Sequence, residues 1–224
     1  FSIRIRKSTC PNGETITTPD NVVTEHQYDL AGNRRYTING KQHTTEWEYD
    51  ELNRIKTLTY PEGDSYTYLY DAAGNLKNEL LPNNQQVDFE YDDINRLIKR
   101  TDSNGTIDYV YDHNSNVTAQ IQTNANSQGS GTETFTYDQF DRLTSKQDIY
   151  GNVSRYSYDK NGNQTALGYG WANDYAVAYH YDAKNRLAGV THGFGSTSLT
   201  YYRDDRIKTK THDNGVITEY TYDG

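Results

Sequence analysis

Aspartate follows tyrosine at nearly regular intervals along this chain of 224 residues. Two carboxylates held close together could serve as general acid and general base, with one of them keeping its proton. A catalytic pair occupies a single place in a protein, whereas these carboxylates recur throughout the sequence. The recurrence favours a structural role, in which each Asp side chain caps the backbone at the start of a turn. The pairs are Tyr28-Asp29, Tyr49-Asp50, Tyr70-Asp71, Tyr91-Asp92, Tyr111-Asp112, Tyr137-Asp138, Tyr158-Asp159, Tyr181-Asp182 and Tyr222-Asp223, and Tyr201 begins a degenerate copy.

Histidine, cysteine and glycine lack the spacings that metal sites and nucleotide-binding loops require. The histidines follow neither an HxxH nor an HExxH pattern, and Cys10 stands alone. Gly168-Tyr169-Gly170 and Gly193-Phe194-Gly195 have too few glycines to cradle a phosphate, and we expect them to be loops. The sequence thus predicts no enzyme, no metal ligand and no cofactor. The histidines are His26, His43, His113, His180, His192 and His212.

The composition points away from a conventional hydrophobic core. Leu, Ile, Val and Phe together number 38 of 224 residues and the net charge is −9, values typical of disorder. Disordered chains are poor in aromatic residues, however, and this one has 22 tyrosines. The acidic balance argues against a nucleic acid partner, and no apolar stretch is long enough to span a membrane. A start at Phe1 and the absence of Met predict a piece of a longer protein.

The Tyr-Asp pairs mark a repeat of about 21 residues. In eight of ten copies another aromatic residue stands two positions before the tyrosine. A spacing of two places both rings on one face of a β-strand, whereas it would separate them on a helix. The upstream aromatic residues are Trp47, Tyr68, Phe89, Tyr109, Phe135, Tyr156, Tyr179 and Tyr220.

Two turn signals divide each repeat into two strands. A Gly-Asn pair, as in Gly32-Asn33, alternates with an Asn-Arg or Asp-Arg pair, as in Asn53-Arg54, four to six residues after the tyrosine. Halfway to the next tyrosine a second signal follows, such as Gly63 or Asn104-Gly105, and both are typical of hairpin turns. The spacing predicts an all-β repeat array of antiparallel hairpins with no helix.

One hairpin cannot bury enough surface to be stable in water. We therefore expect successive hairpins to stack into a long sheet that twists or curves, with the tyrosine rings aligned as a ladder across neighbouring strands. The array is predicted over residues 20–224, preceded by a partial repeat or lead-in strand over 1–19.

The alternating pattern resembles the RHS/YD-repeat family. The motifs that carry the resemblance are YDLAGN, YDELNRI, YDAAGNL, YDDINRL, YDQFDRL, YDKNGN and YDAKNRL. Membership implies a β-hairpin strip that spirals into a hollow shell, as in bacterial polymorphic toxins, Tc toxins, wall-associated proteins and teneurins. In the toxins the shell encloses a C-terminal effector. The Asp-Pro cleavage region that ends many such shells is absent, so we expect shell wall without its cargo.

Two insertions interrupt the period, at residues 123–131 and 167–173. The first has a linker composition and predicts a hairpin tip. The second brings Trp171 close to Tyr169, and we consider both as candidate ligand-binding residues, because exposed aromatic rings stack on sugars. The alternative is that Trp171 packs over its own hairpin.

The leading functional hypothesis is a non-enzymatic structural segment of a large secreted or surface protein, which forms part of a β-shell around a toxin or effector domain. Its partners would be flanking repeats of the same polypeptide and the attached effector. The alternative is an adhesion module that binds carbohydrate or a cell-surface protein through exposed Tyr and Trp side chains.

Overall fold

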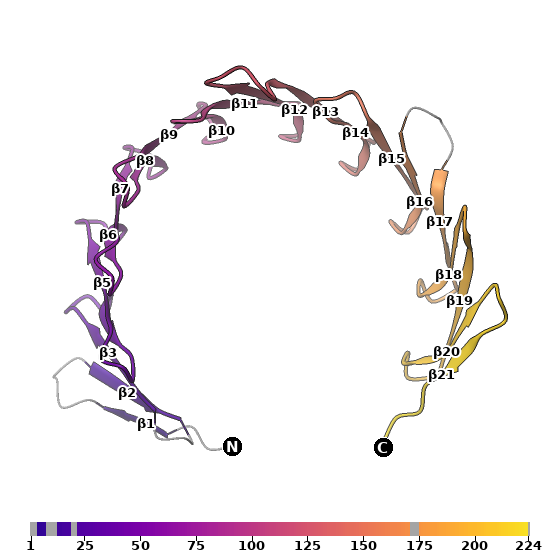
Figure 1. The fold of residues 1–224 in the computed structure, drawn as a ribbon, viewed down its shortest axis with the longest axis horizontal. Helices are drawn as coiled ribbons and strands as arrows, with labels where there is room; N and C mark the ends of the chain where they lie inside the picture. Colours follow the sequence, from indigo (N-terminus) through magenta and orange to yellow (C-terminus); the bar gives the residue numbers. More distant parts are fainter. Residues whose placement is uncertain (1–3, 8–12, 19–21, 171–174, 224) are drawn as a thin grey trace. The chain divides into compact units, whose positions relative to one another are not determined.

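The computed structural model describes residues 4–7, 13–18, 22–170 and 175–223, and within them every regular element is a β-strand (Figure 1). The predicted all-β fold is therefore confirmed. Contacts along the chain divide it into two compact units, residues 1–108 with 124–126, and residues 109–123 with 127–224.

The strands are short, mostly five to seven residues, because turns recur about every ten residues along the chain. Strands that begin in the first unit are β1 (Arg4–Lys7), β2 (Gly13–Thr17), β3 (Val23–Tyr28), β4 (Arg34–Ile38), β5 (Thr44–Tyr49), β6 (Ile55–Thr59), β7 (Ser65–Tyr70), β8 (Leu76–Leu80), β9 (Gln86–Tyr91), β10 (Leu97–Asp102) and β11 (Gly105–Tyr111). The others are β12 (Val117–Asn124), β13 (Gly131–Tyr137), β14 (Leu143–Gln147), β15 (Val153–Tyr158), β16 (Gln164–Tyr169), β17 (Tyr175–Tyr181), β18 (Leu187–His192), β19 (Gly195–Tyr201), β20 (Ile207–His212) and β21 (Ile217–Glu219).

Within each unit, strands that follow one another in sequence pair antiparallel, so the sheet is a run of hairpins without crossovers. In the β5–β6 hairpin, for example, Trp47 lies opposite Leu58 and Glu48 lies opposite Thr57. The register then shifts by one residue, and Tyr49 lies opposite Ile55. The same bulge recurs at the tyrosine of other Tyr-Asp pairs, including Tyr70, Tyr137 and Tyr181. A bulge adds local twist to a strand pair, and its repetition gives the hairpins that close at Tyr-Asp turns the same distortion.

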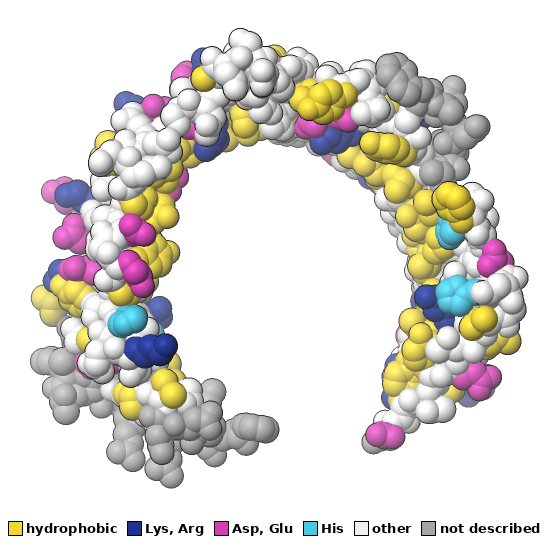
Figure 2. Space-filling model, viewed as in Figure 1, with side chains coloured by type: hydrophobic (Ala, Val, Ile, Leu, Met, Phe, Trp, Pro, Cys, Tyr) yellow, Lys and Arg dark blue, Asp and Glu magenta, His cyan; other side chains and the backbone are white. Residues whose placement is uncertain are grey.

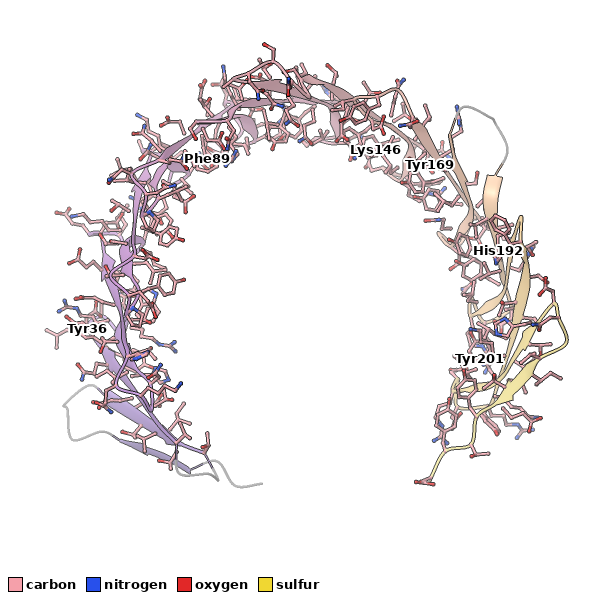
Figure 3. All side chains as sticks on the ribbon, viewed as in Figure 1. Tyr36, Phe89, Lys146, Tyr169, His192 and Tyr201 are labelled. Atoms are coloured by element: carbon pink, nitrogen blue, oxygen red, sulfur yellow. The ribbon has the colours of Figure 1, made fainter. Side chains whose placement is uncertain are left out.

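The two faces of the sheet differ in chemistry. We call the face that carries the Tyr-Asp tyrosines the tyrosine face, and Figure 2 shows hydrophobic side chains gathered along one face in each unit. In β13 the side chains alternate between half-buried Phe135 and Tyr137 and exposed Thr134 and Thr136. In Figure 3, Phe89 and Tyr36 lie on opposite sides of the first unit, as the strand registers require.

Neither unit has a conventional core in the part of the chain that the structure describes. Among the hydrophobic residues, only Val87 and Ala166 are buried there, with 4% and 9% of their surface exposed. Nearly every tyrosine of the repeat is instead half-buried against its neighbours. The scarcity of aliphatic residues in the sequence is thus matched by a sheet that is one layer thick.

Both insertions include residues that belong to strands. At the first, β12 runs to Asn124 and β13 begins at Gly131, so the hairpin tip is shorter than residues 123–131. At the second, the expected loop at Gly168-Tyr169-Gly170 is wrong for its first two residues, which end β16. Gly168 is buried opposite Arg155. The Gly193-Phe194-Gly195 segment is a turn, as expected, although Gly195 already begins β19.

Candidate functional site: the Tyr-Asp turns

Each Tyr-Asp pair from Tyr28-Asp29 to Tyr181-Asp182 ends a strand and begins a five-residue turn at one edge of the sheet, which we call the YD edge. In the turn after β5, the Asp50 amide donates to the Arg54 carbonyl at 2.9 Å and the Asn53 amide donates to the Asp50 carbonyl at 3.0 Å. This is a type I turn followed by a residue in the left-handed region, a common hairpin connection. Asn53 has φ of 61°.

The aspartate carboxylate holds this turn closed from inside. One oxygen of Asp50 accepts hydrogen bonds from the Leu52 and Arg54 amides, both at 2.9 Å. The other oxygen accepts a bond from Arg54 Nε at 2.7 Å. Asp29 makes the corresponding bonds to Ala31 and Asn33. The same arrangement recurs with Asp92, Asp112, Asp138, Asp159 and Asp182.

The left-handed position of the turn explains why Gly and Asn or Asp alternate in the sequence. Gly32, Gly74 and Gly162 have φ between 89° and 95°, and Asn95, Asp141 and Asn185 occupy the equivalent position in neighbouring repeats with φ of 60° to 63°. Glycine adopts such angles without steric cost, and Asn and Asp tolerate them better than other residues.

The tyrosine hydroxyl ties each repeat to the one before it. Tyr70 donates to the Ile55 carbonyl at 2.9 Å, and Tyr158 donates to the Leu143 carbonyl at 2.9 Å. Each acceptor is the first residue of the strand that follows the preceding Tyr-Asp turn, close to the bulge. The series continues with Tyr49, Tyr91, Tyr137, Tyr181, Tyr201 and Tyr222.

Arginine and asparagine at the end of the turn make alternate links to the next repeat. The Arg54 guanidinium lies 4.3 Å from the centre of the Tyr70 ring, and Arg186 lies 4.4 Å from the centre of the Tyr201 ring. Where asparagine replaces arginine, its side-chain amide donates to the left-handed residue of the next turn, as Asn75 does to Asn95 at 2.8 Å. The 42-residue alternation of the sequence is therefore an alternation of two kinds of link.

The expected ladder of stacked tyrosine rings is not what joins the repeats. Within the described residues, ring-to-ring contacts occur at Tyr60–Tyr66, His192–Phe194 and Tyr202–Tyr222, and only the last lies at a Tyr-Asp turn. Successive tyrosines are separated by two strand widths, about 10 Å, which is too far for ring contact. Arginine side chains and hydroxyl-to-carbonyl bonds bridge that distance instead.

The charges of the turns are stabilised in their ionised form. Hydrogen bonds from the side chain and amide of Arg186 lower the pKa of Asp182 to about 2. The pKa of Asp50 is also lowered, first by the Arg54 amide, and that of Asp71 is lowered first by the Asn75 side chain. Burial raises the pKa of Tyr70 and Tyr158 above the usual value. Carboxylates that accept several hydrogen bonds and tyrosines that stay neutral are both features of a structural network.

The degenerate repeat keeps the turn with a displaced carboxylate. Tyr202 occupies the aspartate position, and its amide donates to the Arg206 carbonyl at 2.8 Å, as in the other turns. Asp204 replaces the missing carboxylate and accepts a bond from Arg206 Nε at 2.7 Å. Sequence reasoning missed this compensation, for which the Asp-x-Arg spacing was the available signal.

The remaining candidate residues fall into two groups. Tyr169 ends β16 with 65% of its surface exposed, whereas Trp171 lies outside the described residues. Asp29, Tyr49 and Asp50 line a shallow depression between successive turns.

No cluster of three or more His, Cys, Asp or Glu side chains suited to a metal ion occurs in the described part of the chain. Those residues also contain no helix long and apolar enough to cross a membrane.

Comparison with known proteins yields related sequences that are much longer than this chain. Residues 49–85 and 70–107 each match the family model for the RHS Repeat. Over 131 residues the chain is 32% identical to the tRNA nuclease WapA of Bacillus subtilis and to the tRNA3(Ser)-specific nuclease WapA of Bacillus spizizenii. The match covers 57% of this chain and 5% of each relative.

Solved structures with the same fold belong to toxin assemblies. The crystal structure of TcdB2-TccC3-TEV superposes with a TM-score of 0.69 at 15% identity, covering 99% of this chain and 14% of that one. TcdB2-TccC3 without its hypervariable C-terminal region gives a TM-score of 0.68 at 16% identity over the same shares. The Photorhabdus luminescens Tc holotoxin pore gives 0.57 at 13% identity, covering 93% and 15%. The matches of the RHS Repeat model within residues 49–107, the WapA relatives and the array of Tyr-Asp turns together confirm the predicted resemblance of this chain to the RHS/YD-repeat family.

Proposed function

We propose that the chain is a non-enzymatic wall segment of a larger protein, secreted or displayed at the cell surface, and that this wall encloses or displays an effector domain. The observation that carries the proposal is the linkage of each repeat to the next through three kinds of bond. These are backbone pairing between strands, the bond from the tyrosine hydroxyl to a backbone carbonyl, and the contact that Arg or Asn makes from one turn to the next repeat. Each hairpin, which has no core of its own, is therefore stabilised by its neighbours in sequence.

The tyrosine face suits the inside of such a wall. Its rings are half-buried and their hydroxyls are already bonded to backbone carbonyls, as at Tyr137 and Tyr181. The tyrosine hydroxyls are therefore not available to a polypeptide that lies against this face. Charged side chains such as Glu79 and Lys146 share the face, opposite Tyr68 and Phe135. The opposite face presents Thr134, Thr136 and other hydroxyls to solvent.

The comparisons support the same proposal by analogy. The relatives named as nucleases are about twenty times longer than the matched segment, since the match covers 5% of each. The solved TcdB2-TccC3 chains also extend far beyond it. In our proposal, the present segment contributes wall to a comparable assembly, and any activity resides in other parts of the polypeptide.

Limited proteolysis of the full-length protein tests the proposal. We expect a protease-resistant effector region in the native protein, and loss of that protection when Tyr70, Tyr137 and Tyr158 are replaced together by Ala. Leu52→Ala serves as the control, because Leu52 lies in a turn with 70% of its surface exposed. An effector region that is cleaved equally fast in all three proteins would refute enclosure.

A further inference from the structure

Neighbouring hairpins separate at the YD edge. Between β8 and β9, for example, strand pairing extends toward this edge only as far as Asn78 opposite Asp88, although both strands continue to their turns. The Tyr91 side chain spans the space that remains, since its hydroxyl donates to the Leu76 carbonyl at 3.0 Å. We call such a space, together with the two turns beside it, a turn gap and name it by its two strands.

In alternate turn gaps, an arginine of the chain occupies the space. In the β6–β7 gap, the Arg54 guanidinium lies 4.3 Å from the centre of the Tyr70 ring and pairs with Asp50 at 2.7 Å. In the β14–β15 gap of the second unit, the Arg142 guanidinium lies 4.7 Å from the centre of the Tyr158 ring. A tyrosine ring and a carboxylate thus hold one guanidinium between two hairpins.

The turn gaps between these lack the cation. Asn75 stands at the position that Arg54 has one repeat earlier, and its side-chain amide donates to Asp71 at 3.0 Å and to Asn95 at 2.8 Å. No guanidinium or ammonium group of the described residues lies over the Tyr91 ring. Other Tyr-Asp rings without a cation from the described residues are those of Tyr49, Tyr137 and Tyr181.

An open depression lies in the β8–β9 gap, where the cation is missing. Its volume is about 540 Å³, and Asn75, Tyr91 and the Phe89 side chain (Figure 3) are among the residues that line it. A second depression, of about 360 Å³, lies in the β4–β5 gap and is lined by Tyr49 and Asn53. Tyr49 precedes Tyr91 by two repeats, so the two depressions are equivalent positions of the 42-residue alternation.

The β8–β9 gap carries an excess of negative charge. Its lining includes Asp71, Glu90 and Asp93, and none of these carboxylates has an ion pair within the described residues. The Asn75 side chain lowers the pKa of Asp71, which is therefore ionised at neutral pH. Lys77 is the cation among the lining residues, and its side chain is exposed. Three carboxylates thus face one ammonium group.

We propose that the β8–β9 gap binds the guanidinium group of a ligand, stacked on the Tyr91 ring and bonded to the carboxylates of Glu90 and Asp93. The neighbouring gap shows that this chemistry suits the site, because Arg54 makes the corresponding contacts with Tyr70 there. A guanidinium is favoured over an ammonium group, since it is planar, stacks on aromatic rings and is less strongly hydrated. The inference does not depend on enclosure of an effector, because the gap lies within the chain itself.

The β4–β5 gap should bind the same group more weakly. Its lining contains the two cations Arg35 and Lys56 beside three carboxylates, so that less negative charge remains for a ligand. The carboxylates are those of Asp29, Glu48 and Asp50.

Nuclear magnetic resonance of the chain, labelled with carbon-13 in its tyrosine rings, tests the site with N-acetyl-arginine amide as the probe. We expect the probe to shift the ring signal of Tyr91 and to leave that of Tyr70 unchanged, because Arg54 already covers the Tyr70 ring. Joint replacement Glu90→Gln and Asp93→Asn should weaken binding about two- to fivefold. N-acetyl-citrulline amide, which has the same shape without the charge, should shift neither ring.

Exchange of the residues that link the turns gives matched variants. Asn75→Arg supplies the β8–β9 gap with a guanidinium of its own, so the Tyr91 ring should no longer respond to the probe. Arg54→Asn empties the β6–β7 gap, and the Tyr70 ring should begin to respond. Asn83→Arg is the control, because it adds the same charge in an exposed turn at the other end of the β8–β9 hairpin. Thermal melts identify the folded variants, and Asn75→Arg decides the question alone if Arg54→Asn does not fold.

A peptide with two arginines distinguishes a polypeptide ligand from a small guanidine. Tyr49 and Tyr91 are four strands apart, or about 19 Å, a distance that six residues of an extended peptide span. Tighter binding of a peptide whose arginines are six residues apart would assign the gaps to arginine side chains of a polypeptide. Affinity equal to that of N-acetyl-arginine amide would assign them to a small guanidine, and both results support a guanidinium site.

Three results would overturn the proposal. One is the absence of any shift of the Tyr91 ring with N-acetyl-arginine amide. Another is an equal shift with N-acetyl-citrulline amide, because the site would then not recognise charge. The third is a Tyr91 response that persists in Asn75→Arg, because the probe would then bind elsewhere than in the gap.

Discussion

The tyrosine hydroxyls provide a direct test of how the repeats are joined. In the second unit, Tyr158, Tyr181 and Tyr201 donate to backbone carbonyls of the preceding repeat at 2.9, 3.0 and 2.7 Å. Replacing each by Phe removes one oxygen atom and leaves the ring in place. The change therefore isolates the link between repeats from the packing of the ring.

The magnitude follows from the nature of the bond. An intramolecular hydrogen bond contributes about 0.5–1.5 kcal/mol net, and the acceptor carbonyls lie in a sheet one layer thick, where water can replace the lost donor. We expect each single variant to lower the free energy of unfolding by about 0.5–1 kcal/mol. The triple variant should lose roughly 1.5–3 kcal/mol, since sites in separate repeats contribute nearly additively.

Urea denaturation followed by tyrosine near-ultraviolet circular dichroism measures the loss. A change of 1 kcal/mol corresponds to a melting shift of about 2–4 °C for a chain of this size. Tyr169→Phe is the control, because no hydrogen bond of the Tyr169 hydroxyl is seen among the described residues, and its midpoint should stay unchanged.

The reasoning fails if the triple variant unfolds at the same urea concentration as the original chain. It also fails if Tyr169→Phe is as destabilising as Tyr158→Phe, because the effect would then reflect loss of a hydroxyl anywhere and not of the inter-repeat bond. An altered dependence on urea would show that the variant had changed the surface exposed on unfolding.

Four further predictions concern the turns and the tyrosines. Gly162→Val should lower the free energy of unfolding by about 1–2 kcal/mol, because a β-branched residue is strained in the left-handed region. Gly162→Asn should be better tolerated, since Asn185 occupies the equivalent position in another turn. Thermal melts compare the two variants. Acid titration should leave the fold intact to about pH 5 and then destabilise it progressively. The pKa of Asp182 in the folded chain, about 2, lies below its unfolded value, so the contribution of Asp182 to the free energy of unfolding is present above the unfolded pKa and is lost as pH falls toward 2. Circular dichroism against pH measures this loss. Because burial raises the pKa of Tyr158, the opposite sign holds in alkali, where stability should fall above about pH 10 as tyrosinate absorbance appears. Arg186→Gln should lower the melting temperature, because Arg186 contacts Asp182, Asp205 and the Tyr201 ring, and Arg203→Gln is the exposed-arginine control.

These outcomes bear on whether the segment can act as a wall. A strip whose stability is distributed over many equivalent links tolerates local damage, since each hairpin contacts only its neighbours. Its resistance to mild acid would follow from the low pKa of the turn carboxylates, and its sensitivity to alkali from the tyrosines. Both properties belong to the repeat and not to any single position.

The sequence by itself determined the fold class, the repeat and the position of the turns. The turns are predicted by residues such as Asp50, Asn53 and Gly63, because their backbone and side-chain preferences act within five residues and need no distant partner. The spacing of two between Trp47 and Tyr49 likewise indicates a strand, because it is a local property of the backbone.

Only the tertiary structure decided how the repeats are joined. Tyr70 bonds to a carbonyl fifteen residues earlier, and Arg54 reaches the ring of Tyr70 in the next repeat; both contacts depend on register and on the bulge, which the sequence does not specify locally. Short-range preferences fix where a chain turns, and the pairing of strands fixes which side chains then meet.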